Sequence, residues 1–94
     1  MGQEKAYSLK YHRLVPADLE GIDTFWRTRI NNAIEDKLTI QPEFFGKPLR
    51  QSLKGCRSLR VEDYRVIFQI EETTVKILII GHRRDVYQRA GKRI

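Results

Sequence analysis

Along the N-terminal half of the chain, apolar residues change from every second position to every third or fourth. Residues 6–11 alternate apolar and polar side chains, which predicts a strand with one buried face. Pro16 suits the first turn of a short helix over residues 15–21. A longer helix is predicted from Asp23, which can cap its N-terminus, to Leu38. Its apolar stripe comprises Phe25, Trp26, Ile30, Ala33, Ile34 and Leu38.

The C-terminal half begins with a connector and continues with three strands. Residues 39–48 are rich in proline and glycine, as connectors are, and we expect Phe44 and Phe45 to pack back onto the core. Runs of alternating or β-branched residues predict strands at 58–61, 64–71 and 74–80.

The order of these elements predicts an α+β fold. The turns at 62–63 and 71–73 are short enough to join antiparallel neighbours, so the three strands form a meander. We expect the two helices to form a hairpin that covers one face of an antiparallel sheet, which also holds the N-terminal strand. Residues 90–94 are expected to be a flexible basic tail.

Length, composition and charge limit the number of domains and the kind of partner. A chain of 94 residues with 40% hydrophobic residues predicts one packed domain, residues 1–94. The net charge is +6, and it is concentrated in two segments. Residues 47–65 hold six basic and two acidic residues, and residues 82–94 hold five basic and one acidic residue, so each segment carries +4. This distribution favours an acidic partner, and RNA is the first to consider.

Several classes of protein are disfavoured. Cys56 is the only cysteine, which excludes an intramolecular disulfide, and with two histidines it makes no obvious zinc set. We therefore expect no metal and no cofactor, and a Cys56 that is a small, semi-buried apolar residue. The sequence has no apolar run of the length that a membrane span needs and no signal-peptide pattern, so we predict a cytoplasmic protein without a membrane partner.

Basic residues at the ends of two strands mark a candidate anion site. If these strands are neighbours, Arg65, Arg83 and Arg84 can converge on one polyanion, with Tyr87 close enough to exchange a proton with it. Plainer roles are also open. In these roles, Arg65 forms a salt bridge across the turn and Tyr87 is an aromatic residue that closes the end of the sheet. His82 then faces solvent.

Five segments, in this order and spacing, resemble the RelE branch of the RelE/ParE superfamily of bacterial and archaeal toxins. They cover nearly the whole chain, and they are residues 33–38 (AIEDKL), 46–49 (GKPL), 53–55 (LKG), 59–68 (LRVEDYRVIF) and 81–87 (GHRRDVY).

The resemblance implies a metal-independent endoribonuclease that enters the ribosomal A site and cuts messenger RNA. A ribose 2′-OH would attack the adjacent phosphate and leave a 2′,3′-cyclic phosphate, a reaction that needs a base, an acid and cations. The implied partners are the ribosome, the messenger and a RelB-like antitoxin, with operator DNA bound only through the antitoxin complex.

The resemblance also implies roles for individual residues. Arg65 would hold the phosphate, Arg83 would stabilise charge or protonate the leaving group, and Tyr87 would be the base. Arg60 would be a further charge stabiliser, and Ser58 stands where some members carry a second lysine. Basic residues in the two charged segments are predicted to bind RNA or the ribosome: Lys47, Arg50, Lys54, Arg57, His82 and Arg84.

Two other functions remain open on the same residues. The chain could be a ParE-like toxin that inhibits DNA gyrase without RNA chemistry. It could also be a catalytically degenerate toxin that acts as a co-repressor with its antitoxin. The presence of Arg60, Arg83 and Tyr87 favours the ribonuclease, because a gyrase inhibitor has no need of this cluster.

Overall fold

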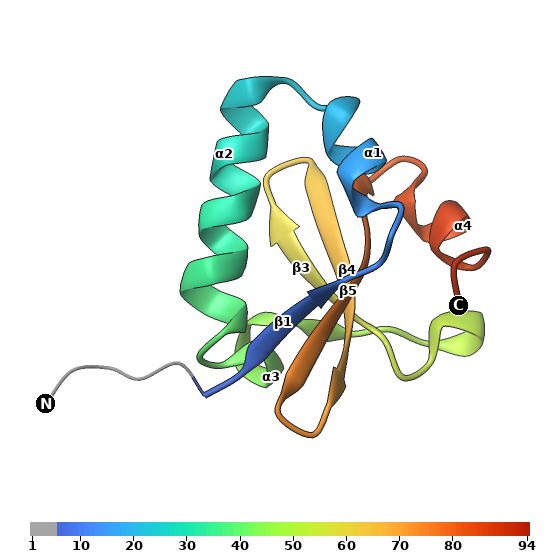
Figure 1. Cartoon of the computed structure of the whole chain (residues 1–94). Coiled ribbons are helices and arrows are strands. Elements are labelled where there is room, and N and C mark those ends of the chain that lie inside the picture. Colours follow the sequence, from blue (N-terminus) through green and yellow to red (C-terminus); the bar gives the residue numbers. More distant parts are fainter. Residues whose placement is uncertain (1–5) are drawn as a thin grey trace, which may run out of the picture.

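The computed structural model describes residues 6–94 as one five-stranded sheet with helices packed on it (Figure 1). The strand order is β1-β5-β4-β3-β2. The elements, in chain order, are β1 (Ser8–Tyr11), α1 (Val15–Glu20), α2 (Thr24–Ala33), the π-helical turn η1 (Ile34–Leu38), α3 (Pro42–Phe45), β2 (Lys47–Pro48), the 3-10 turn η2 (Gln51–Leu53), β3 (Arg57–Val61), β4 (Tyr64–Glu71), β5 (Thr74–His82) and α4 (Val86–Ala90).

The α+β class is confirmed, and the structure adds two details of strand pairing. β1 runs parallel to β5, because the helix hairpin carries the chain back to the other end of the sheet before the meander begins. β2, β3, β4 and β5 pair antiparallel. β2 lies in the predicted connector, and it adds a short edge strand beside β3.

The helix hairpin covers one face of the sheet. Helix α2 begins where the sequence predicts but ends at Ala33, and the π-helical turn η1 carries the chain on to the predicted end at Leu38. The side chain of Asp23 accepts a hydrogen bond from the backbone N of Trp26 at 3.0 Å and caps α2. Ile30, Ile34 and Leu38 are fully buried against this face. In Figure 1, α2 lies to the left of the strands and α4 to the right.

Three aromatic residues are not where the sequence predicted them. Phe25 is 59% exposed, outside the buried stripe of α2, and its ring packs edge-on against Trp26. Phe44 and Phe45 do not enter the core, since Phe44 is 77% exposed and its ring packs edge-on against that of Phe45. The buried residue of α3 is Pro42, and this leaves the two phenylalanines on the outer side of that one-turn helix.

The opposite face of the sheet carries a second, smaller core. It is formed by Leu53, Cys56, Ile67, Leu78, Ile79, Val86 and Ala90. The last two belong to α4, a helix that the sequence did not predict. The expected flexible tail at 90–94 is also not what the structure shows, because Ala90 is buried and Arg93 pairs with Asp18 in α1 at 2.7 Å. Among residues 6–94, no helix is long and apolar enough to cross a membrane.

Candidate functional site

A pocket of about 260 Å³ lies on the face of the sheet that carries α4. Four elements supply its walls: β2, β3, β4 and α4. It is lined by Lys47, Leu49, Ser58, Arg60, Arg65 and Tyr87. The structure therefore brings together three of the four residues predicted to be catalytic, and it adds Lys47, which was predicted to bind RNA.

Arg60 and Arg65 meet because β3 and β4 form a hairpin with a two-residue turn. They are directly opposite in the register of the two strands, so their side chains point to the same face. Ile67, two residues after Arg65, packs with Val86 of α4, which identifies that face. Like charges directly opposite one another destabilise a strand pair. A bound anion would remove this repulsion, so the arrangement suits anion binding better than it suits folding.

Arg65 is oriented by the turn that precedes it. Its Nη1 donates to the carbonyl oxygens of Glu62 at 2.7 Å and Tyr64 at 2.8 Å. Glu62 has a left-handed backbone (φ +54°), which a residue with a Cβ adopts at a cost. The plainer expectation of a salt bridge across the turn is therefore replaced by bonds to backbone carbonyls. These bonds engage Nη1, and a guanidinium has five N–H donors.

Lys47 and Tyr87 place a cation and a hydroxyl beside Ser58. Lys47 is directly opposite Ser58 in the β2–β3 pairing, so it supplies a positive charge next to Ser58. The Tyr87 hydroxyl lies 3.3 Å from Oγ of Ser58, in hydrogen-bond contact. Tyr87 is 36% exposed, and it lines the pocket.

Arg83 does not line the pocket. Its backbone N donates to the carbonyl of Asp63 at 2.8 Å, and its Nε lies 3.5 Å from Oδ1 of the same residue. Both side chains are more than half exposed. Arg83 thus lies at the β3–β4 turn, at the same end of the strands as Arg65 but outside the group that faces Tyr87.

Two residues predicted to bind RNA also make contacts within the fold. The His82 ring packs against Tyr64, with ring centroids 5.6 Å apart, and its Nδ1 accepts from the backbone N of Arg84. Arg57 donates through Nη1 to the carbonyls of Glu43 and Gly46, which tethers α3 to β3.

The remaining predicted RNA-binding residues, Arg50, Lys54 and Arg84, are exposed and do not line the pocket. A second hollow, of about 370 Å³, shares Arg60 with the pocket and lies between α2 and β3. It adds Arg29 of α2 and Lys37 of η1, two basic residues that were not selected from the sequence. The spacing of Arg29 and Lys37 along the helix predicts that they share a face. It does not predict that this face lies beside β3.

The thiol and the carboxylates offer no alternative centre in the described part of the chain. Burial raises the pKa of the Cys56 thiol, and a hydrogen bond from Gln69 lowers it by less. A reactive thiolate would need the opposite shift, so Cys56 is a packing residue, as predicted. Residues 6–94 contain no group of three or more His, Cys, Asp or Glu side chains placed to hold a metal ion.

Comparison with known proteins finds a toxin family and related toxins. A family model described as the ParE toxin of the type II toxin–antitoxin system parDE matches residues 9–87. Toxin RelG from Mycobacterium tuberculosis is 40% identical over 80 residues, which are 83% of this chain and 83% of RelG.

Solved structures share the fold. A chain of the toxin–antitoxin complex RelBE2 from Mycobacterium tuberculosis matches with a TM-score of 0.78 and 30% identity, over 83% of this chain and 99% of that chain. A mutant of the E. coli toxin RelE in the free state matches with a TM-score of 0.73 and 21% identity, over 95% of this chain and 98% of that chain. The RelE-like fold expected from the sequence is thereby confirmed.

Proposed function

We propose that this chain, which belongs to the RelE/ParE superfamily of type II toxin–antitoxin toxins, is a ribosome-dependent endoribonuclease that cuts messenger RNA in the A site. The observation that carries the proposal is the pocket in which Arg60 and Arg65 lie directly opposite one another beside Tyr87. Two facing arginines match the charge that develops on a phosphate during attack by the 2′-OH.

The pocket residues divide the reaction between them. Arg65, already oriented by the turn, binds a non-bridging phosphate oxygen, and Arg60 stabilises the second. Tyr87, as the phenolate, takes the proton from the 2′-OH, whose oxygen forms the new O–P bond as the bond to the 5′-oxygen breaks. Lys47, opposite Ser58 in the β2–β3 pairing, stabilises the phenolate before this proton transfer.

Arg83 joins the pocket only when it leaves Asp63. Exposed ion pairs contribute about 1 kcal/mol or less to stability, so a bound phosphate can compete for this guanidinium. In this proposal Arg83 stabilises charge or protonates the leaving 5′-oxygen once RNA is bound, and Arg65 holds the phosphate from the start.

A RelB-like antitoxin is the second proposed partner, and it is supported by relatives whose structures are toxin–antitoxin complexes. The net charge of +6 favours an acidic segment that orders on binding. Such a segment inhibits the toxin if it covers the basic pocket, and operator DNA is then reached only through the complex.

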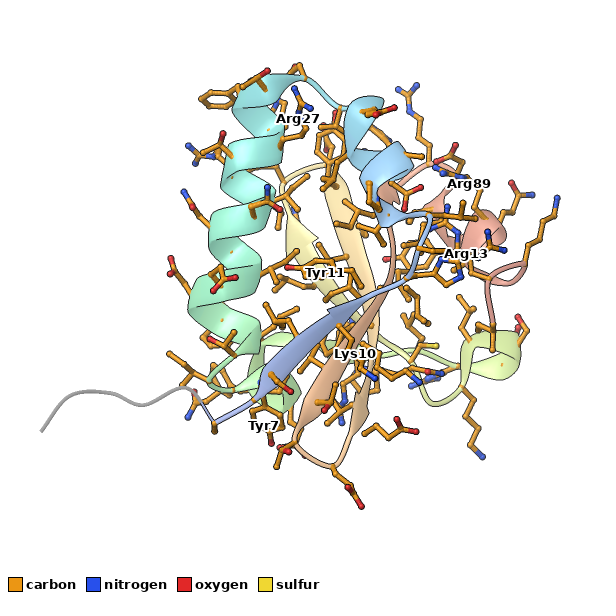
Figure 2. The ribbon with its side chains drawn as sticks, in the orientation of Figure 1. Tyr7, Lys10, Tyr11, Arg13, Arg27 and Arg89 are labelled. Atoms are coloured by element: carbon orange, nitrogen blue, oxygen red, sulfur yellow. The ribbon has the colours of Figure 1, made fainter. Side chains whose placement is uncertain are left out.

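The test is to induce the chain without antitoxin and to map the 5′ ends of a translated reporter messenger by primer extension. We expect cuts that follow the reading frame and stop when translation initiation is blocked. The double variant Arg60→Gln/Arg65→Gln should give no cuts. Arg27→Gln is the matched control, because Arg27 is a half-buried arginine on α2, outside the pocket, whose Nη2 donates to Oγ1 of Thr24 (Figure 2).

The family model that matches is described as ParE, which keeps gyrase inhibition as a second candidate. A supercoiling assay with purified gyrase separates the two. Full supercoiling activity in the presence of the chain, together with frame-dependent cuts, supports the ribonuclease. Inhibited gyrase and an intact messenger would overturn the proposal in favour of the second candidate.

A further inference from the structure

Asp18 is a buried carboxylate that lies outside the pocket and has every acceptor position engaged. It lies in α1, and its side chain is 2% exposed. Its Oδ1 accepts from Nη2 of Arg89 at 3.1 Å and from Nη2 of Arg93 at 2.8 Å. Its Oδ2 accepts from Nη1 of Arg93 at 2.7 Å and from the backbone N of Ile80 at 3.1 Å. Arg93 therefore binds this carboxylate through two parallel bonds, a strong and directional geometry.

The same network closes an open edge of the sheet. β1 pairs with β5 only as far as Ile77, which leaves the following residues of β5 without a neighbouring strand on that side. Asp18 takes the N–H of Ile80, and Nη1 of Arg93 donates to the carbonyl of Leu78 at 2.9 Å. Since buried backbone groups need partners, these two side chains complete the edge.

Helix α4 depends on contacts of this kind for its position. It has five residues, fewer than an isolated helix needs to be stable in water. Val86 and Ala90 pack it onto the sheet, over Gly81, where a Cβ would lie 3.2 Å from Cγ2 of Val86. Apolar contacts alone allow the helix to rotate, but Arg89, which is labelled in Figure 2, donates from α4 to Asp18 in α1.

We propose that Asp18 is a positioning residue for the pocket, which acts through Arg89 and Arg93 to hold α4 with the Tyr87 hydroxyl beside Ser58. This inference rests on the proposed function. None of the hydrogen-bond partners of Asp18 lines the pocket, so its effect on cleavage must pass through α4. It follows that the last residues of the chain are needed for full activity.

Arg93→Met tests this role, because methionine keeps much of the aliphatic stem and removes every bond to Asp18. Lys92→Met is the matched control, since Lys92 is the exposed neighbour of Arg93. The assay is single-turnover cleavage of messenger on programmed ribosomes with the full chain. We expect Arg93→Met to lower the maximal cleavage rate by at least about 10-fold, which is part of the rate enhancement that a positioned proton-transfer group contributes. The toxin concentration that gives half of the maximal rate should not change. Lys92→Met should stay within about twofold of the original chain.

A double-mutant cycle separates positioning from general loss of structure. In a Tyr87→Phe background the hydroxyl is already absent, so Arg93→Met should lower the rate by less than about twofold. An equal loss in both backgrounds, or no loss in the original chain, would overturn the role of the network. If Arg93→Met does not fold, Arg89→Met replaces it in the cycle. This substitution removes one bond to Asp18 and a 4.0 Å ion pair with Asp85 from a half-exposed side chain.

Hydrogen exchange gives a readout that does not depend on cleavage. Arg93→Met should speed exchange of the Arg89 amide, which donates to Asp85 within α4, and leave the β3–β4 amides unchanged. Unchanged exchange in α4 would contradict the inference even if the chain cuts no RNA. Absence of cleavage by the original chain, with faster exchange in α4, would count against the proposed function alone.

Discussion

Replacing Arg60 by glutamine should stabilise the fold while it removes activity. Arg60 is exposed and lies directly opposite Arg65. A like-charge pair at directly opposed positions costs roughly 0.2–1 kcal/mol, and the substitution removes that cost while it keeps a polar, though shorter, side chain. Within residues 6–94 the Arg60 guanidinium makes no hydrogen bond or ion pair, so the substitution breaks no such contact there.

The stabilisation should be visible in thermal unfolding and should depend on salt. A gain of about 0.5 kcal/mol raises the Tm of a domain of this size by about 2–4 °C. The Debye length falls from about 30 Å at 0.01 M salt to about 3 Å at 1 M, so the gain should be largest in dilute buffer and should disappear in 1 M NaCl.

The other member of the pair provides the contrast. Arg65→Gln relieves the same repulsion but loses the bonds from Nη1 to the carbonyls of Glu62 and Tyr64, each worth about 1 kcal/mol. We therefore expect Arg65→Gln to be destabilising by about 1.5 kcal/mol. Arg27→Gln, the control, should change stability by less than about 0.5 kcal/mol. A lower Tm for Arg60→Gln, or a gain that persists in 1 M NaCl, would refute the repulsion argument.

Three further substitutions or reactions test the packing. Gly46→Ala should destabilise the fold by about 1–3 kcal/mol in urea unfolding, because its Cβ would lie 2.2 Å from Cζ of Phe68; a neutral result would contradict the close approach. Asp23→Ala should cost about 1 kcal/mol by loss of the cap on Trp26, measured by thermal unfolding against Asp23→Asn, which retains a capping oxygen. Because burial raises the pKa of Cys56, we expect slow reaction with a thiol reagent at pH 7.5 in the folded state and fast reaction in urea. Equal reaction rates in the folded and unfolded states would show that the thiol is not buried. Because the pKa of Cys56 is raised in the folded state, the contribution of this thiol to the free energy of unfolding should fall as the pH rises past about 9.

Much of the fold follows from periodicity in the sequence. Ile30, Ile34 and Leu38 repeat every four residues and are fully buried, and the two tight turns separate the meander strands where predicted. The prediction that Phe44 and Phe45 pack onto the core was wrong, because hydrophobicity alone does not say which side of a one-turn helix faces the core. Helix α4 was missed because five residues carry too little periodic signal.

The candidate site was predictable where it depends on neighbouring strands. Arg60 and Arg65 flank a two-residue turn, so their meeting follows from the hairpin register. The contact of Lys47 with the same pocket depends on a two-residue edge strand whose register no local pattern reveals. The pairing of Asp18 with Arg93 joins residues 75 positions apart, and only the three-dimensional fold brings them together.

The most direct test of the central claim is cleavage of a messenger with one 2′-deoxyribose at the nucleotide whose 2′-OH is the proposed nucleophile. The purified chain is mixed in excess with programmed ribosomes, and the single-turnover rate is compared with that of the all-ribose messenger. The account predicts rapid cleavage of the all-ribose messenger to a 2′,3′-cyclic phosphate and no cleavage of the deoxy-substituted one. Cleavage of both messengers at the same position and rate would contradict attack by the 2′-OH in a pocket formed by Arg60, Arg65 and Tyr87.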